Sequence, residues 1–143
     1  MSEAREVMDR FAAAMSAGDL AAMTACYAPD VIAVTPDVGE MMGREAISDY
    51  LQEFANAFPD MAYEYARQHD AGNVVIDEGY ITGTNTGPLV VLPGETLPPT
   101  GKQIRMRSCD IAEVEDGLIT SHRFYFDQLD FLGQLGLLPD LHA

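Results

Sequence analysis

The spacing of apolar side chains changes near residue 60 of this 143-residue chain. Before that point, residues 3–17 and about 44–57 place apolar side chains three and four positions apart, which predicts two helices that each bury one face. From Met61 onward apolar and polar residues alternate instead, as they do in strands with one buried face. Helices followed by a run of strands are typical of an α+β fold, in which helices pack on a mostly antiparallel sheet.

Turn and cap residues divide these two halves into shorter elements. Gly18 is expected to end the first helix, Asp19 to cap a short second one, and Pro59 to close the third. The proline- and glycine-rich segment 86–101 predicts a loop that interrupts a hairpin. We therefore expect one domain, with about three N-terminal helices against one sheet. The expected strands are 31–35, 62–69, 73–84, 104–115 and 118–127.

Charge and hydropathy limit the kinds of partner and the cellular compartment that we expect for this chain. Asp and Glu total 23 against 8 Lys and Arg, and the resulting net charge of -15 repels nucleic-acid backbones and anionic lipid surfaces. No apolar run approaches the roughly 20 residues of a membrane span, and the charged N-terminal segment lacks the apolar stretch of a signal peptide. Cys26 and Cys109 make no disulfide framework. We expect a cytoplasmic protein without nucleic-acid or membrane partners.

One carboxylate interrupts the apolar side of the third long strand. An unpaired charge there is unfavourable, so Asp110 must be paired, hydrogen-bonded, hydrated or protonated. It is either a structural aspartate satisfied by its neighbours or a functional group in a cavity, where perturbed carboxylates are enriched. Alternation groups six residues on the side that should face the helices: Ile104, Met106, Ser108, Asp110, Ala112 and Val114.

Three further titratable residues are candidates for the site. His122 shares its side of the last strand with Phe124 and Phe126, which predicts an imidazole at the wall of an inner cavity. Asp37 lies in the loop after the first strand, where it either makes ordinary turn contacts or projects over the cavity mouth. Asp127 immediately precedes the tail helix and is either its N-cap or a second catalytic carboxylate.

Motifs for metals and cofactors are missing from the sequence. It holds no glycine-rich phosphate loop, no zinc-type Cys/His spacing and no serine elbow. Its three histidines, His69, His122 and His142, are scattered without the spacing of metal ligands. We therefore expect neither a cofactor nor a metal.

Several segments together resemble a known family. GTNTGPL (83–89), LPPTGK (97–102) and DIAEVEDGLITSHRFYFDQLDFLGQLGL (110–137) are similar to SnoaL-like polyketide cyclases of the nuclear-transport-factor-2-like superfamily. The opening segment 10–39 resembles the start of the same superfamily, including its ketosteroid isomerases. The resemblance implies one domain over residues 1–143, a cone of curved sheet and three helices, and a pocket for hydrophobic molecules. It also implies a homodimer that forms through the sheet.

Family roles transfer to some positions only. Phe124 stands where SnoaL-like cyclases and limonene-epoxide-hydrolase-like proteins have an acid/base aspartate, and Asn85 stands where the family often has histidine. The comparison with ketosteroid isomerases matches Asp110 to a protonated aspartic acid that donates to the oxyanion, and Asp37 to the loop aspartate that acts as base. The oxyanion tyrosine of those isomerases corresponds to Phe11.

The first functional hypothesis is a cofactor-independent cyclase or isomerase that moves a proton on a hydrophobic carbonyl substrate of polyketide, lactone or steroid type. Asp110 would be the acid or hydrogen-bond donor, Asp37 the base and His122 the alternative base. If the second long strand faces inward at its even-numbered residues 76–82, Tyr80 orients the substrate and Glu78 rivals Asp110. The expected substrate contacts are Asn85, Tyr80, Phe11, Phe54, Phe124, Phe126 and Ser108.

Two alternatives stay open. The same cone can serve as a non-catalytic module that binds a hydrophobic ligand, which the phenylalanines at positions 11 and 124 favour. A third hypothesis is an epoxide-hydrolase-like enzyme whose carboxylates have moved to other positions.

Overall fold

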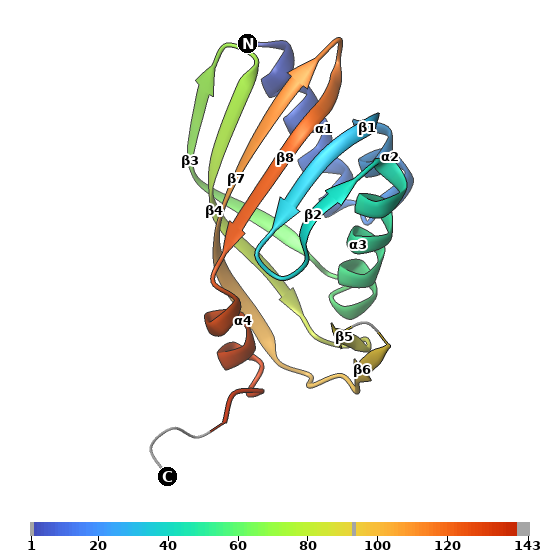
Figure 1. Ribbon diagram of the computed structural model, residues 1–143. Coiled ribbons are helices and arrows are strands. Elements are labelled where there is room, and N and C mark those ends of the chain that lie inside the picture. Colours follow the sequence, from blue (N-terminus) through green and yellow to red (C-terminus); the bar gives the residue numbers. More distant parts are fainter. Residues whose placement is uncertain (1, 93, 140–143) are drawn as a thin grey trace.

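The computed structural model describes residues 2–92 and 94–139 (Figure 1). Long strands follow the three N-terminal helices, which confirms the predicted α+β class. The helices of this part of the chain are α1 Glu3–Ser16, α2 Leu20–Ala25, α3 Arg44–Ala57 and α4 Gln128–Gln134. Its strands are β1 Tyr27–Thr35, β2 Gly39–Met42, β3 Ala62–Ala71, β4 Val74–Thr84, β5 Leu89–Leu92, β6 Glu95–Leu97, β7 Gln103–Glu115 and β8 Leu118–Phe126.

Six of these strands form one sheet in the order β2-β1-β8-β7-β4-β3. β1 and β8 run parallel, and the other neighbours in the sheet are antiparallel. Figure 1 shows the long strands bending, with α1 and α3 on one side of the sheet. β5 and β6 pair separately inside the proline-rich segment. The first strand begins four residues earlier than predicted, because Tyr27 already pairs with Ile119 before a bulge.

Side-chain caps fix the ends of three helices. The hydroxyl of Ser2 accepts a bond from the backbone N–H of Arg5 at the start of α1, and Asp19 caps α2. Asp127 accepts bonds from the backbone N–H groups of Leu129 and Asp130 at 2.9 and 3.1 Å. These donors have no partner within the helix, so the cap stabilises α4 by about 1 kcal/mol. The structure therefore uses Asp127 as the helix cap.

Gly79 on β4 allows the neighbouring strand β3 to pack closely against β4. A β-carbon at Gly79 would overlap the carbonyl oxygen of Glu64 and lie 2.9 Å from the ring of Tyr63. The β3–β4 register also shifts between Tyr65 and Arg67. A bulge of this kind bends a strand and re-aims its side chains. The missing side chain at Gly79 leaves room for the ring of Tyr63, whose hydroxyl donates to the carbonyls of Asp77 and Ser108 at 3.2 Å.

The interior contains two apolar clusters. The first lies between α1–α3 and the sheet, and the second fills the end of the fold where α4 and β5 meet α3. No helix among residues 2–92 and 94–139 is long and apolar enough to cross a bilayer. The first cluster includes Val7, Met8, Phe11, Met23, Tyr27, Val31, Ile47, Leu51 and Ile119, and the second includes Phe58, Leu89, Ile104, Met106, Phe131 and Leu135.

Candidate active site

Asp110 projects from the inner side of β7 toward a small cavity beside α1. Its side chain is 14% exposed, and Asp77 lies directly opposite it on β4. The cavity volume is about 20 Å³, which is enough for roughly one water molecule. The alternation of side chains along residues 104–115 therefore predicted correctly that Asp110 lies on the inner side of the sheet. The lining combines apolar side chains of α1 with two tyrosines and two carboxylates: Met8, Phe11, Ala12, Met15, Tyr63, Tyr65, Asp77 and Asp110.

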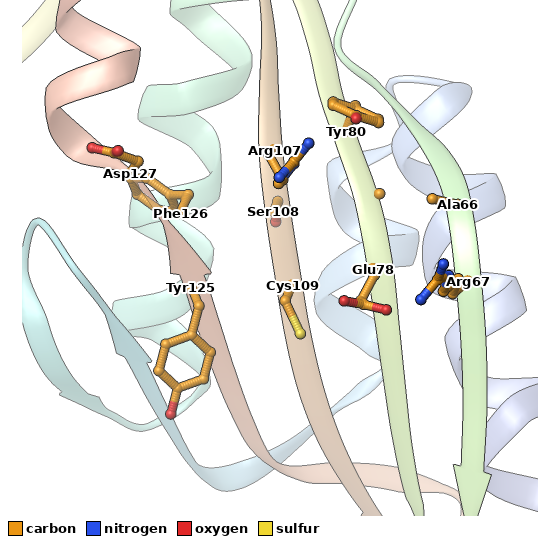
Figure 2. A pocket seen from close by; sticks show the side chains of 11 residues that line it. Ala66, Arg67, Glu78, Tyr80, Arg107, Ser108, Cys109, Tyr125, Phe126 and Asp127 are labelled. Atoms are coloured by element: carbon orange, nitrogen blue, oxygen red, sulfur yellow. The ribbon is translucent and has the colours of Figure 1, made fainter.

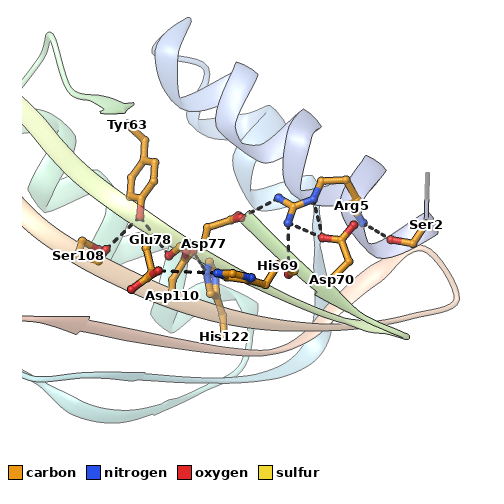
Figure 3. Close-up of polar contacts among 10 residues, drawn as sticks. All are labelled: Ser2, Arg5, Tyr63, His69, Asp70, Asp77, Glu78, Ser108, Asp110 and His122. Carbon is orange, nitrogen blue, oxygen red and sulfur yellow. Dashed lines mark hydrogen bonds and ion pairs between the residues drawn. The ribbon is translucent and has the colours of Figure 1, made fainter. Parts of the chain in front are cut away.

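Two consecutive buried hydrogen bonds, from Asp110 to His122 and from His122 to Tyr27, form a hydrogen-bonded chain that fixes the Asp110 carboxylate. Oδ2 of Asp110 lies 2.6 Å from Nε2 of His122, as Figure 3 shows. Nδ1 of His122 lies 2.8 Å from the hydroxyl of Tyr27. Both rings are fully buried, and Phe11 packs edge-on against each of them. The chain links β7 through β8 to β1, so three strands fix the orientation of the carboxylate.

The surroundings of Tyr27 determine where the protons of this chain lie. Burial, and then the negative charge of Asp110, raise the pKa of Tyr27 well above its ordinary value. The phenol therefore keeps its proton and can donate a hydrogen bond to Nδ1 of His122, while the carboxylate of Asp110 can only accept one from Nε2. A histidine that accepts at Nδ1 carries its proton on Nε2. His122 thus donates to Asp110, which leaves the second carboxylate oxygen free for the cavity.

A second buried carboxylate belongs to an ion-pair network that holds α1 on the sheet. Nη1 of Arg5 lies 2.7 Å from Oδ1 of Asp77, and its Nε donates to Asp70 at 2.9 Å. Arg5 and Asp77 are both almost fully buried. Desolvation by burial is the largest influence on Asp77 and raises its pKa, although Arg5 opposes this. Figure 3 shows Arg5 reaching both aspartates from α1.

The sequence-based interpretation missed Asp77 because it chose the wrong phase for β4. Asp77 pairs with Asp110 and Gly79 with Ser108, so the odd-numbered residues of β4 face the helices. Tyr80 and Glu78 therefore lie on the outer side, and neither contacts the cavity. Arg5 carries the signal that could have corrected this: it lies on the apolar stripe of α1, and a buried arginine needs a carboxylate partner.

Two further candidates lie elsewhere in the fold. Asp37 is exposed and accepts a bond from the hydroxyl of Tyr50 at 3.1 Å; it does not line the cavity beside Asp110. Asn85 is fully buried, and its amide is saturated. Its Nδ2 donates to the carbonyls of Ala57 and Gly87, and its Oδ1 accepts from Thr100. The Asn85 side chain therefore ties the end of α3 to two loops, and both its amide hydrogens and its oxygen are already used.

The predicted apolar wall is divided between the two clusters. Phe11 lines the cavity, and Phe124 packs beside it against His122 with ring centroids 4.0 Å apart. Phe54 and Phe126 pack in the second cluster, away from Asp110. Ser108 is buried on the inner side of β7, where its carbonyl accepts a bond from Tyr63 at 3.2 Å. Of the four predicted phenylalanines, Phe11 thus lines the cavity, together with the two tyrosines of β3, and Phe124 lies behind it against His122.

No group of three His, Cys, Asp or Glu side chains in the described part of the chain is arranged to hold a metal ion. His69 is exposed on β3, where its Nε2 lies 3.8 Å from Glu78. His142, the third histidine of the sequence, lies outside the described residues.

Comparisons with solved structures match the fold over nearly the whole chain. A proposed SnoaL-like polyketide cyclase from Jannaschia sp. CCS1 has a TM-score of 0.82 at 16% identity, covering 96% of this chain and 94% of that one. AclR, a proposed hydroxylase from Streptomyces galilaeus, has a TM-score of 0.81 at 21% identity, covering 96% and 98%. IdmH, a proposed polyketide cyclase from Streptomyces antibioticus, has a TM-score of 0.76 at 25% identity, covering 93% and 98%.

A family comparison agrees with the structural one. None of the curated proteins matches the chain in sequence. The family model described as a SnoaL-like domain, however, matches residues 8–122. This range includes Phe11, Tyr27, Asp77, Asp110 and His122, which form the inner cavity and the hydrogen-bonded chain behind it. The chain therefore belongs to the SnoaL-like domain family.

Proposed function

We propose that this protein is a cofactor-independent acid/base enzyme that moves a proton on a small hydrophobic carbonyl compound, of polyketide, lactone or steroid type. The observation that carries the proposal is the bond of 2.6 Å between Asp110 and His122 at the wall of a cavity that α1 lines with apolar side chains. Membership of a family that includes proposed cyclases supports the same reaction class. Cyclisation and double-bond migration both begin with removal of a proton next to a carbonyl.

Asp110 is the base in this proposal, in place of Asp37. One of its oxygens is held by His122, so the other is oriented toward a substrate in the cavity. The developing oxyanion needs a neutral donor. Tyr65 lines the same cavity, and burial, with the charges of Asp77 and Asp110, raises its pKa to about 12. Its phenol is therefore protonated at neutral pH and supplies the hydrogen bond.

Substrate entry requires side chains to move. The cavity of about 20 Å³ admits roughly one water molecule and no carbonyl compound. Met15 and Tyr65 line it and are themselves partly exposed. Methionine and tyrosine rotate without disturbing the backbone, so these two side chains form the gate of the proposed site.

Exchange of α-protons in heavy water tests the proposal without knowledge of the natural substrate. β-Tetralone and a benzofuranone lactone are incubated with the protein in D₂O, and loss of their α-proton signals is followed by NMR. Asp110→Asn should slow the exchange about 10²- to 10⁴-fold, because an amide cannot accept the proton. Asp37→Asn is the matched control, and it should exchange the probes as the unaltered protein does.

The outcomes separate the proposal from its main alternative. The acid/base function is wrong if the unaltered protein binds the two probes, seen as line broadening, yet never accelerates their exchange; the fold then serves as a binding module. It is also wrong if Asp37→Asn abolishes exchange while Asp110→Asn does not.

We also propose that the protein forms a homodimer through the outer side of the β1–β2 hairpin. Ile32, Val38 and Met42 are 41%, 57% and 70% exposed there, and Ile32 lies directly opposite Met42. Exposed apolar groups gathered in this way mark interaction surfaces. Met42→Lys should shift the mass measured by light scattering from dimer to monomer, whereas Leu129→Lys, on the similarly exposed Leu129 of α4, should not. A monomeric unaltered protein would refute this.

A further inference from the structure

The outer side of the sheet differs in charge from the rest of this acidic chain. Its outward positions on β3, β4, β7 and β8 carry four of the 8 Lys and Arg but only four of the 23 Asp and Glu. The chain as a whole has a net charge of -15. Positive and negative side chains are therefore equal in number on the outer side of the sheet, whereas the remaining surface is negative and repels anions. The residues concerned are Arg67, Arg105, Arg107, Arg123, Glu64, Glu78, Glu113 and Glu115.

A groove crosses the outer side of the sheet from β3 to β8 (Figure 2). Its volume is about 660 Å³, within the range of roughly 300–1,000 Å³ that small-molecule sites occupy. Two arginines, two carboxylates and the rings of Tyr80 and Tyr125 contribute to its lining. The lining is Ala66, Arg67, Glu78, Gly79, Tyr80, Arg107, Ser108, Cys109, Tyr125, Phe126 and Asp127.

The two arginines of the groove, Arg67 and Arg107, differ in their ion pairing from the other two arginines on the outer side of the sheet. Arg105 pairs with Glu64 at 3.2 Å and Arg123 with Glu113 at 3.0 Å. Within the described residues, Arg67 and Arg107 make no ion pair closer than 4.0 Å. The guanidinium of Arg107 lies 5.9 Å from the ring centre of Tyr80. A hydrogen bond to Tyr80 raises the pKa of Arg107, and a guanidinium has five N–H donors, so Arg107 keeps further donors for a ligand.

We propose that the groove binds a planar aromatic carboxylate. Arg107 binds the carboxylate through its paired N–H donors, which match the two oxygens of that group. The aromatic part lies along the groove toward Tyr125, which is 51% exposed on the neighbouring strand. Glu78 and Asp127 keep the local net charge near zero, so a monoanion is favoured over phosphate. Arg67, at the β3 end, adds weaker long-range attraction.

Titration with naphthoate, followed by its fluorescence, tests this site on the complete chain. Arg107→Gln should weaken binding at least tenfold, and Arg67→Gln two- to threefold. Arg123→Gln is the matched control, because Arg123 lies on the same side outside the groove and is already paired with Glu113. Naphthalenemethanol, the neutral analogue, should bind far more weakly than naphthoate, and added salt should weaken naphthoate binding.

Several results would overturn the proposal. Naphthoate affinity that is unchanged in Arg107→Gln, or equal to that of naphthalenemethanol, removes the role of the guanidinium. Affinity lost in Asp110→Asn but kept in Arg107→Gln assigns the ligand to the inner cavity. A dimer that dissociates on Arg107→Gln, with no naphthoate bound by the unaltered protein, assigns the groove to a second copy of the chain. Light scattering of each variant distinguishes this last case.

Discussion

Replacing Arg5 by methionine is expected to lower the free energy of unfolding by about 3–5 kcal/mol at neutral pH. Methionine fits the apolar stripe of α1, so the loss comes from Asp77, whose carboxylate stays buried without the guanidinium 2.7 Å away. Asp70, the other partner of Arg5, is 41% exposed and can be solvated by water. Urea unfolding followed by circular dichroism measures the difference.

The effect of Arg5→Met should depend on pH in a predictable direction. The pKa of Asp77 in the folded protein is already raised above its ordinary value, mainly by burial, although Arg5 lowers it. Without Arg5 the rise is larger. A carboxyl group with a raised folded pKa contributes most stability below its unfolded pKa, and that contribution is lost as pH rises through the folded value. The difference in the free energy of unfolding between Arg5→Met and the unaltered protein should therefore shrink as the pH falls from about 7 to about 4.

Two further variants isolate the buried charge as the cause. Arg10→Met alters an exposed arginine of the same helix and should change the unfolding free energy by less than about 0.5 kcal/mol. Adding Asp77→Asn to Arg5→Met should recover part of the loss, because an amide is less costly to bury than an unpaired carboxylate. A loss that is independent of pH and not recovered by Asp77→Asn would mean that packing, and not charge, determines the effect.

His122→Phe should destabilise the protein by about 3 kcal/mol, because it leaves two buried partners without their bond. The hydroxyl of Tyr27 loses its acceptor, and Asp110 loses its donor. Phenylalanine preserves the aromatic packing against Phe11 and Phe124, so little volume is lost. The α-proton exchange measured above should fall as well, since Asp110 loses the contact that orients it.

A double-mutant cycle with Tyr27→Phe checks the hydrogen-bonded chain. Once His122 is phenylalanine, removing the orphaned hydroxyl should restore about 1 kcal/mol, whereas Tyr27→Phe alone should be destabilising. Thermal unfolding of the four proteins gives the coupling energy. Additive effects would contradict the bond of 2.8 Å between Tyr27 and Nδ1 of His122.

The sequence predicted the fold and the centre of the site from local rules. The helical stripes, the run of strands after residue 60 and the Asp127 cap are each decided within about ten residues, and the structure agrees with them. Alternation along β7 and β8 also placed Asp110 and His122 on the inner side. The hydrogen bond between Asp110 and His122 follows from the pairing of β7 with β8. The single hairpin turn between these strands sets that pairing.

Longer-range contacts account for what the sequence could not predict. The phase of β4 depends on Arg5, which lies 72 positions away from Asp77. Asp37 was assigned to the cavity from its loop position, but the structure turns it toward Tyr50. Asn85 matches a family position, yet its four bonds go to the end of α3 and to two loops, whose placement no local pattern specifies. Tyr27 was not among the predicted site residues, because its partner His122 lies 95 positions away.

The position of β8 in the sheet has a consequence for the newly made chain. β1 lies between β2 and β8, and of the strands in this sheet its parallel partner β8 is made last. Until residues 118–126 emerge, the β1–β2 hairpin has no other neighbour in the sheet, and Tyr27 lacks His122. Contacts this distant make folding slow and cooperative. The domain should therefore mature only after β8 has been made, and a product truncated before β8 should be degraded.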